Sequence, residues 1–228
     1  MADPRQDQSD LPSCLDQAVL DPLLTVEQLH ERCDAGRQER VRALCTSLRQ
    51  LPLLRERLGG QGGPKLIAAI GFPFGALPAE LRLAEATWAA AHGADELDVV
   101  PDFSALVEGD SSGFAEDLAA ITGLGLPVRV VLDMARLPED LLAIAVEASI
   151  DADAAGRQSG NGFGPPCQAE QVAALSGLCR GRCAIKAAGG IHHPELAMDL
   201  LEAGAALLGT SSAPELLQAL RRLSLIHI

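Results

Sequence analysis

The sequence contains very few lysines and very few aromatic residues. Only Lys65 and Lys186 accompany 16 arginines in the 228-residue chain, and Phe, Trp and Tyr together make up 3% of it. Lys186 ends a short apolar run in "CAIKAAGG", residues 183–190, directly before two small residues and a pair of glycines. A lysine at this place in an arginine-rich chain indicates chemistry that a guanidinium cannot perform.

The chain also lacks positive charge and long apolar runs. Its net charge of −13 argues against nucleic acid or an anionic membrane as a partner, because no basic stripe could outweigh the general repulsion. An anionic ligand would instead need a local group of backbone amides. No apolar run approaches the roughly 18 residues of a membrane span, and the acidic N-terminal segment is not a signal peptide. We therefore expect a cytoplasmic protein.

Nothing in the cysteine spacing completes a metal site. The six cysteines are Cys14, Cys33, Cys45, Cys167, Cys179 and Cys183. Cys179 and Cys183 flank "RGR", but no second pair and no neighbouring set of histidines supplies further zinc ligands. In a chain without a secretion signal these residues are typical of reduced, structural thiols. We expect no metal and no cofactor.

Short apolar runs alternate with helical patterns along the chain. Segments such as 77–94 and 192–205 space their apolar residues three and four apart and carry a glycine near the end. No hairpin signal separates the runs, so we predict parallel strands in an α/β fold, a closed (β/α)₈ TIM barrel. The alternative is a doubly wound open sheet, although no G-x-G-x-x-G follows the first strand. The expected strands lie within 14–20, 42–47, 66–72, 96–100, 127–133, 183–188 and 206–212, with a weaker one at 149–156.

The two ends of the chain differ from the part between them. Residues 1–13 are polar and contain proline, which predicts a mobile tail before a single barrel at 14–223. The last six residues, "LSLIHI", match a translation of the common transposase sequencing adaptor. We interpret residues 224–228 as a non-native tail, the alternative being an ordinary apolar tail, and leave His227 out of the functional argument.

Asp98 is the first candidate for chemistry. It lies within the expected strand "ELDVV", 96–100, and could point into the barrel. A buried carboxylate without a partner is expensive, so we expect Asp98 to pair with Lys186 from another strand. The pair could be purely structural. It could also form a proton-relay or amine site, in which burial and a second charge tune the pKa of the lysine.

Two loops near the end of the chain predict a phosphate site. Gly189 and Gly190 open the loop after the Lys186 strand, and "GTSS", 209–212, ends the next strand before a helix that begins near Ala213. Backbone amides of such loops and of a helix start bind phosphate in barrels of this kind. His192 and His193 follow the glycine pair, and we interpret them as a solvated helix start rather than as metal ligands.

Five segments of the chain resemble motifs of the deoxyribose-phosphate aldolase family, in order and at the right separation. The resemblance runs from about residue 14 to residue 221. It implies a (β/α)₈ barrel and a class I aldolase reaction without metal, the cleavage of 2-deoxyribose 5-phosphate to acetaldehyde and glyceraldehyde 3-phosphate in deoxyribonucleotide catabolism. The ligand would be a small phosphorylated sugar or aldehyde, and a homodimer is one possible assembly. The segments are "LDQAVLDPLLTVEQLHERC" (15–33), "IGFPFGA" (70–76), "GADELDVV" (93–100), "IKAAGGI" (185–191) and "EAGAALLGTSS" (202–212).

The resemblance also implies roles for individual residues. Asp98 matches the carboxylate that relays protons, and Lys186 matches a second lysine whose charge lowers the pKa of the Schiff-base lysine. The residues that match phosphate contacts are Gly189, Gly190, Ser211 and Ser212.

The Schiff-base lysine itself is replaced in this chain. In the family it lies in a motif close to Ala-Asp-Phe-Val-Lys-Thr-Ser-Thr-Gly, and the corresponding stretch here is "ADAAGRQSGNGFGPP", 152–166. Aligned from its left end the lysine becomes Gly156, and aligned from "GFG" it becomes Gln158. Neither residue can form an imine, and the guanidinium of Arg157 is a poor nucleophile.

Three functions remain open at this point. The chain could be an aldolase in which Lys186 forms the Schiff base. It could be a non-catalytic relative that binds a sugar phosphate as a sensor or an assembly partner. It could also carry out a different acid–base reaction on a phosphorylated ligand through Asp98 and Lys186.

Overall fold

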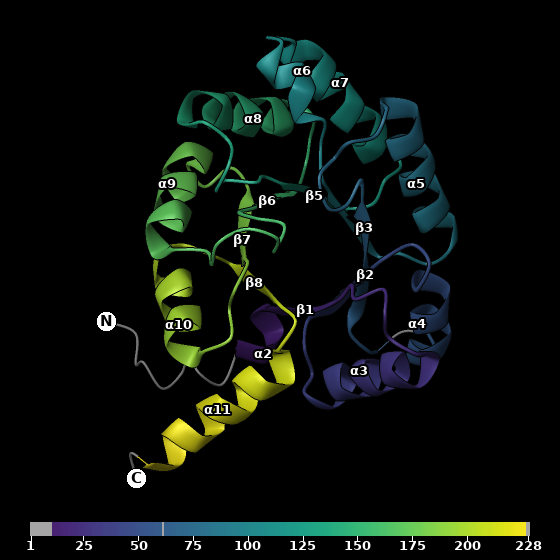
Figure 1. Ribbon diagram of the computed structural model, residues 1–228, viewed down its shortest axis with the longest axis vertical. Coiled ribbons are helices and arrows are strands. Elements are labelled where there is room, and N and C mark those ends of the chain that lie inside the picture. The colour runs from purple at the N-terminus through teal and green to yellow at the C-terminus, as the bar shows by residue number, and fades with distance from the viewer. Residues whose placement is uncertain (1–10, 61, 227–228) are drawn as a thin grey trace.

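The chain folds into a closed barrel of parallel strands with helices around it (Figure 1). The structure, a computed structural model, describes residues 11–60 and 62–226. Each strand pairs with the next one and β8 pairs with β1, so the (β/α)₈ barrel is confirmed and the open sheet is wrong. The strands are β1 (Leu15–Val19), β2 (Ala43–Thr46), β3 (Lys65–Ile70), β4 (Glu96–Val99), β5 (Val128–Val131), β6 (Gly156–Gln158), β7 (Ala184–Ala188) and β8 (Leu207–Thr210).

Helices connect the strands and begin at residues suited to that place. Thr25 and Gln28 form a capping box at the start of α3, and Pro194 is the first residue of α10. Asp110 accepts a hydrogen bond from the Gly113 amide at the start of α7. The helices are α2 (Leu11–Cys14), α3 (Val26–Gln38), α4 (Leu51–Leu58), α5 (Ala79–Ala91), α6 (Phe103–Val107), α7 (Ser111–Thr122), α8 (Glu139–Asp151), α9 (Ala169–Cys179), α10 (Pro194–Glu202) and α11 (Ala213–Ile226).

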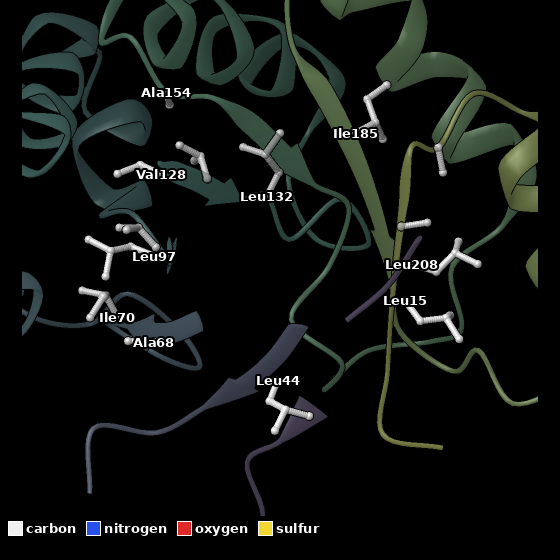
Figure 2. Close-up of a cluster of buried hydrophobic side chains, with 14 of the residues drawn as sticks. Leu15, Leu44, Ala68, Ile70, Leu97, Val128, Leu132, Ala154, Ile185 and Leu208 are labelled. Atoms are coloured by element: carbon white, nitrogen blue, oxygen red, sulfur yellow. The ribbon is translucent and has the colours of Figure 1, made fainter. Parts of the chain in front are cut away.

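The two faces of the strands carry different side chains. Leu44, Leu97 and Leu208 belong to the large buried apolar cluster, part of which is drawn in Figure 2. Successive side chains of a strand point to opposite faces, so the residues next to these leucines along each strand point into the barrel. There the register places Asp98 beside Arg129 and Gln158 beside Lys186. Much of the barrel interior is therefore polar, where branched apolar side chains usually fill it.

The sixth strand does not lie where the sequence predicted it. The weak candidate at 149–156 is wrong, because α8 continues to Asp151. β6 instead covers Gly156–Gln158, at the start of the segment "GRQSGNG", whose glycines and polar residues are typical of a loop. None of these three residues is apolar, so hydrophobic periodicity could not reveal the strand. Pairing with β5 and β7 holds it in the barrel.

The ends of the barrel chain also differ from expectation. Leu11–Cys14 form α2 and Leu11 is buried, so the predicted tail at 1–13 is too long, while residues 1–10 lie outside the described residues. At the other end α11 continues through Ile226, and residues 227–228 are not described. The non-native origin of 224–228 stays a prediction. Within the described part of the chain, no helix is long and apolar enough to cross a membrane.

Candidate functional site

A cavity of about 290 Å³ opens among the residues at the carboxyl ends of the strands. Ligand sites of this fold lie at that end of the barrel. Asp98, Lys186 and Gln158 line its inner part, while residues of the β7 and β8 loops line it further out. The cavity is thus formed by two of the predicted features, the charged pair and the glycine–serine loops.

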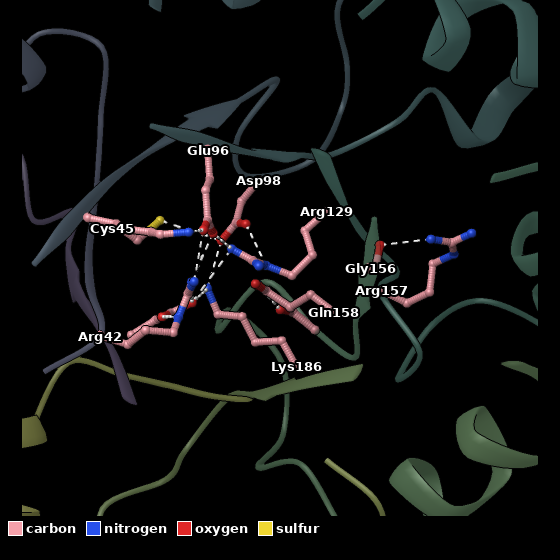
Figure 3. Close-up of polar contacts among 12 residues, drawn as sticks. Arg42, Cys45, Glu96, Asp98, Arg129, Gly156, Arg157, Gln158 and Lys186 are labelled. Atoms are coloured by element: carbon pink, nitrogen blue, oxygen red, sulfur yellow. Dashed lines mark hydrogen bonds and ion pairs between the residues drawn. The ribbon is translucent and has the colours of Figure 1, made fainter. Parts of the chain in front are cut away.

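Lys186 lies in the middle of β7 and its amine contacts two carboxylates (Figure 3). Nζ donates to Oδ2 of Asp98 at 2.7 Å and is 2.9 Å from Oδ2 of Asp16. The predicted pairing of Asp98 with Lys186 is therefore confirmed, although its role is still a prediction. The sequence analysis missed Asp16. The same signal that singled out Asp98, a carboxylate inside an apolar strand, would have found it.

Further cations surround these acids. Arg129 donates from Nε to Oδ1 of Asp98 at 3.0 Å and from Nη2 to Oε2 of Glu96 at 2.9 Å. Burial alone would raise the pKa of Asp16, but the charge of Lys186 and the guanidinium of Arg42 hold it below its usual value. Burial also opposes ionisation of Glu96, and hydrogen bonds from Arg42 and Lys65 lower its pKa all the same. Both acids remain carboxylates at neutral pH.

These carboxylates keep Lys186 charged. Burial alone would lower the pKa of its amine, but the charges of Asp16 and Asp98 outweigh it and raise the pKa above the ordinary 10.5. At neutral pH Lys186 is therefore an ammonium group. An ammonium group has no lone pair with which to attack a carbonyl carbon. It can donate hydrogen bonds and neutralise negative charge at the cavity.

Gln158 faces Lys186 across the β6–β7 pair. The two Cα atoms are in register and both side chains line the cavity. Gln158 donates from Nε2 to the Gly160 carbonyl at 2.7 Å, and its Oε1 has no hydrogen-bond partner among the described residues. Gly156 lies at the start of β6, away from the cavity lining. The missing lysine could correspond to Gly156 or to Gln158, and of these two positions only Gln158 lines the cavity.

The glycine and serine loops lie at the outer part of the cavity. Gly189 and Gly190 have φ angles of +115° and +68°, and a Cβ on Gly190 would meet Pro166 at 2.7 Å. Both glycines and Ser211 line the cavity, whereas Ser212 does not. The Ser212 amide donates to Oγ1 of Thr210 at 3.0 Å, which fixes this loop before α11.

His192 and His193 are both exposed just before α10, as the interpretation of a solvated helix start predicts. α10 begins at Pro194, with His193 at the N-cap position but without a side-chain capping hydrogen bond. His192 lines the cavity, and its Nδ1 lies 3.2 Å from Oγ of Ser212. It thus links the two loops for which a phosphate is predicted.

The rim of the cavity carries residues that the sequence analysis did not single out. Phe163 packs edge-on against Phe72 and Phe74, with ring centroids 5.8 and 5.9 Å apart. Asn161 donates to the Pro73 carbonyl at 3.0 Å and ties the β6 loop to the β3 loop. Across residues 11–60 and 62–226, no group of three or more His, Cys, Asp or Glu side chains could hold a metal ion.

Comparisons with known proteins give the family. A scan against protein-family models finds no match. Deoxyribose-phosphate aldolase of Thermosynechococcus vestitus is 34% identical over 213 residues, covering 92% of this chain and 96% of the relative. The protein of that name from Thermococcus gammatolerans is 32% identical over 218 residues, covering 93% and 97%.

Solved structures agree with these relatives. The aldolase QR15 superimposes with a TM-score of 0.89 at 29% identity, covering 95% of this chain and 98% of that one. Deoxyribose-phosphate aldolase from Aeropyrum pernix, described as having a unique tetrameric structure, gives a TM-score of 0.85 at 28% identity, covering 95% and 93%. With 34% identity over nearly the full length of both proteins, this chain belongs to the deoxyribose-phosphate aldolase family.

Proposed function

We propose that the chain binds a small phosphorylated sugar or aldehyde in the barrel cavity but does not turn it over through an imine at neutral pH. The observation that carries the proposal is the state of Lys186. Of the chain's two lysines, both in described segments, only Lys186 lines the cavity, and it is held as an ammonium group by Asp16 and Asp98. An imine on Lys186 would need its amine to be neutral, because only the neutral amine has the lone pair that attacks a carbonyl carbon.

The binding part of the proposal rests on the outer part of the cavity. Gly189, Gly190 and Ser211 line it, and α11 begins at Ala213, two residues after Ser211. Glycine loops and helix starts of this kind supply backbone amides that bind anions. His192 adds an imidazole at the same place. In a chain with a net charge of −13, a local site of this kind is what an anionic ligand requires. The relatives' name makes 2-deoxyribose 5-phosphate the first ligand to test.

The second part of the proposal, the loss of imine chemistry, rests on the neighbouring strands β6 and β7. Gln158 takes the place in β6 that faces Lys186, and an amide nitrogen does not form a Schiff base. A second cationic lysine at that position would have lowered the pKa of its neighbour, whereas here the neighbours of Lys186 are acids. The charged pair therefore stabilises the barrel and orients polar groups at the cavity.

A second function is favoured by one observation. Lys186 both lines the cavity and lies 2.7 Å from Asp98, a carboxylate able to relay protons. In a slow aldolase, a small neutral fraction of Lys186 would form the imine. Because its pKa is raised, such turnover would increase about tenfold with each pH unit between pH 7 and pH 9.

The test is trapping with acetaldehyde and borohydride at pH 7, followed by intact mass and peptide mapping. Lys65 is the internal control, because its side chain is 54% exposed and its amine is accessible to non-specific reductive alkylation by acetaldehyde and borohydride. We expect an ethyl adduct on Lys65 but none on Lys186. Thermal unfolding should meanwhile shift upward with 2-deoxyribose 5-phosphate, as mass action requires. A reduced adduct on Lys186 with turnover of the sugar phosphate would overturn the proposal in favour of the slow aldolase.

A further inference from the structure

The cavity has two unlike walls. Asp98 of β4, Gln158 of β6 and Lys186 of β7 form the polar wall. On the side of β1, β2 and β3, the lining residues beyond Asp16 toward the carboxyl ends of the strands are small or apolar. With one residue of the β6 loop they form what we call the apolar wall, which consists of Ala18, Leu20, Cys45, Ala69, Phe72 and Phe163. A ligand in the cavity therefore lies between a charged surface and an apolar one.

The apolar wall is backed by a small apolar cluster of its own. Four buried residues of β2 and β3 form a cluster separate from the large one, namely Ala43, Cys45, Ile67 and Ala69. Leu20 and Phe72 pack against this cluster. Cys45 is uncharged at neutral pH, because burial and the neighbouring charge of Asp98 raise the pKa of its thiol. The wall is thus the surface of a packed apolar interior.

Phe163 extends the apolar wall to the mouth of the cavity. The residue is 67% exposed, and its ring packs edge-on against Phe72 and Phe74. Phe74 is also more than half exposed. The chain has five phenylalanines and one tryptophan, so half of its aromatic residues meet at this point. Exposed apolar groups that gather beside a cavity are typical of a ligand-binding surface.

Hydrogen bonds hold the two loops that carry these rings. The Gly71 amide donates to Oε2 of Glu85 at 2.7 Å, and the buried Arg82 donates from Nη1 to a carbonyl of the same β3 loop at 3.1 Å. In the β6 loop, Oδ1 of Asn161 accepts a hydrogen bond from the Phe163 amide at 2.9 Å. The wall is therefore formed before a ligand binds, which limits the conformational freedom lost on binding.

We propose that the cavity selects a phosphate ester with an apolar carbon chain over one whose chain carries hydroxyls. The inference rests on the proposed function for its phosphate site at Gly189, Gly190 and Ser211. With the phosphate there, the carbon chain lies between the two walls. Methylene groups against the apolar wall leave water favourably, whereas a hydroxyl there gives up water without gaining a hydrogen-bond partner. Of the ligands proposed above, a phosphorylated aldehyde with few hydroxyls fits this cavity better than a sugar.

Calorimetric titration with three simple esters at pH 7.5 tests the preference. Propyl phosphate and glycerol 3-phosphate have the same three carbons and differ by two hydroxyls, while methyl phosphate supplies the phosphate with almost no chain. We expect propyl phosphate to bind roughly tenfold more tightly than methyl phosphate, because two further methylenes are buried. Glycerol 3-phosphate should bind no more tightly than methyl phosphate. Equal affinity of the two three-carbon esters, or a tighter complex with glycerol 3-phosphate, would overturn the proposal.

A parallel titration with 2-deoxyribose 5-phosphate separates this inference from the proposed function. Binding of the sugar phosphate without a preference for propyl phosphate contradicts the inference and leaves the proposed function standing. A preference for propyl phosphate with no binding of the sugar phosphate supports the inference and removes sugar phosphates from the proposed function. If none of the esters binds, both fail.

Two variants test whether the apolar wall sets the preference. Phe163→Ser changes an exposed side chain, and we expect the ratio of the propyl to the methyl phosphate affinity to fall severalfold. The control is Val107→Ser on α6, which is 72% exposed and lies outside the cavity lining, so the ratio should stay as in the wild type. Ala18→Ser places a hydroxyl in the wall and should favour glycerol 3-phosphate relative to propyl phosphate. A preference that both wall variants leave unchanged would overturn the proposal.

Discussion

β6 and β7 are neighbours in the barrel, and each places a long polar side chain at the same level of the cavity. On β7, Lys186 contacts two carboxylates, and those carboxylates have further cations around them. On β6, Oε1 of Gln158 and two nitrogens of Arg157 lack hydrogen-bond partners among the described residues. Buried polar groups are nearly always paired, so β6 departs from the rule, as does Gln17 on β1, whose amide nitrogen and oxygen also lack partners among the described residues. The difference indicates that β7 retains a polar network fitted to its side chain and that β6 does not.

The largest effect on stability is expected from Lys186→Met. The change leaves Asp16 and Asp98 buried with one cation fewer, and breaking a buried pair in this way costs about 3–5 kcal/mol in free energy of unfolding. Urea denaturation measures the loss. The matched control is Lys65→Met, the chain's other lysine. Its side chain is 54% exposed, and its partner Glu96 keeps Arg42 and Arg129, so the loss of stability should be smaller. Equal stability of the two variants would show that β7 is no better paired than the surface.

Gln158→Lys should place an amine on β6 at the position that faces Lys186. The new amine would face Lys186 across the strand pair, and the positive charges of Lys186 and Arg129 would lower its pKa so that part of it is neutral near pH 7. We expect a borohydride-trapped adduct at position 158 and cleavage of 2-deoxyribose 5-phosphate roughly a hundredfold above the wild-type chain. Gln158→Met is the control without an amine. A folded Gln158→Lys protein that gives no adduct would show that the cavity has changed beyond this one residue.

The charged network predicts how stability depends on pH. The pKa values of Asp16 and Glu96 are lowered on folding, so their contribution is present above the unfolded values near 4 and is lost as the pH falls toward the folded ones. The pKa of Lys186 is raised, so its contribution is present below 10.5 and is lost as the pH rises through the folded value.

Urea unfolding at several pH values tests this profile. We expect a plateau from about pH 5 to pH 10 with a steep fall on the acid side. Asp16→Asn should lower the plateau and flatten the acid side, because one of the titrating groups is removed. An acid limb of the same steepness in this variant would mean that the network does not set the pH dependence.

Much of the fold could be predicted from the sequence, because seven strands carry apolar residues at recognisable spacing. The pairing of Asp98 with Lys186 could also be predicted, since a carboxylate inside an apolar strand needs a cation. β6 could not, because its residues Gly156–Gln158 have no apolar signal and are held by their neighbours' hydrogen bonds. His192 and Asn161 reach the cavity through loop geometry, which local sequence does not encode.

A smaller effect is expected for ligand binding at the outer part of the cavity. Ser211→Ala removes one hydroxyl at the predicted phosphate site, and one hydrogen bond to a charged group contributes about 1.5 kcal/mol, or roughly tenfold in Kd. Calorimetric titration with 2-deoxyribose 5-phosphate measures this change. Ser112→Ala on α7, far from the cavity lining, is the control and should leave Kd unchanged. Equal Kd values in the two variants would place the phosphate elsewhere.

The smallest effect is expected from Gln158→Met, judged by stability alone. Methionine nearly matches the length of glutamine. The change removes the hydrogen bond to the Gly160 carbonyl, worth about 1 kcal/mol, and it also removes the cost of burying the unpaired Oε1. These contributions offset each other, so the free energy of unfolding should change by less than about 1 kcal/mol. Gln158→Met and Lys186→Met thus make the same new side chain at facing positions. If both variants lower the free energy of unfolding by the same amount, β6 and β7 differ in their hydrogen-bond geometry but not in what that geometry contributes to stability.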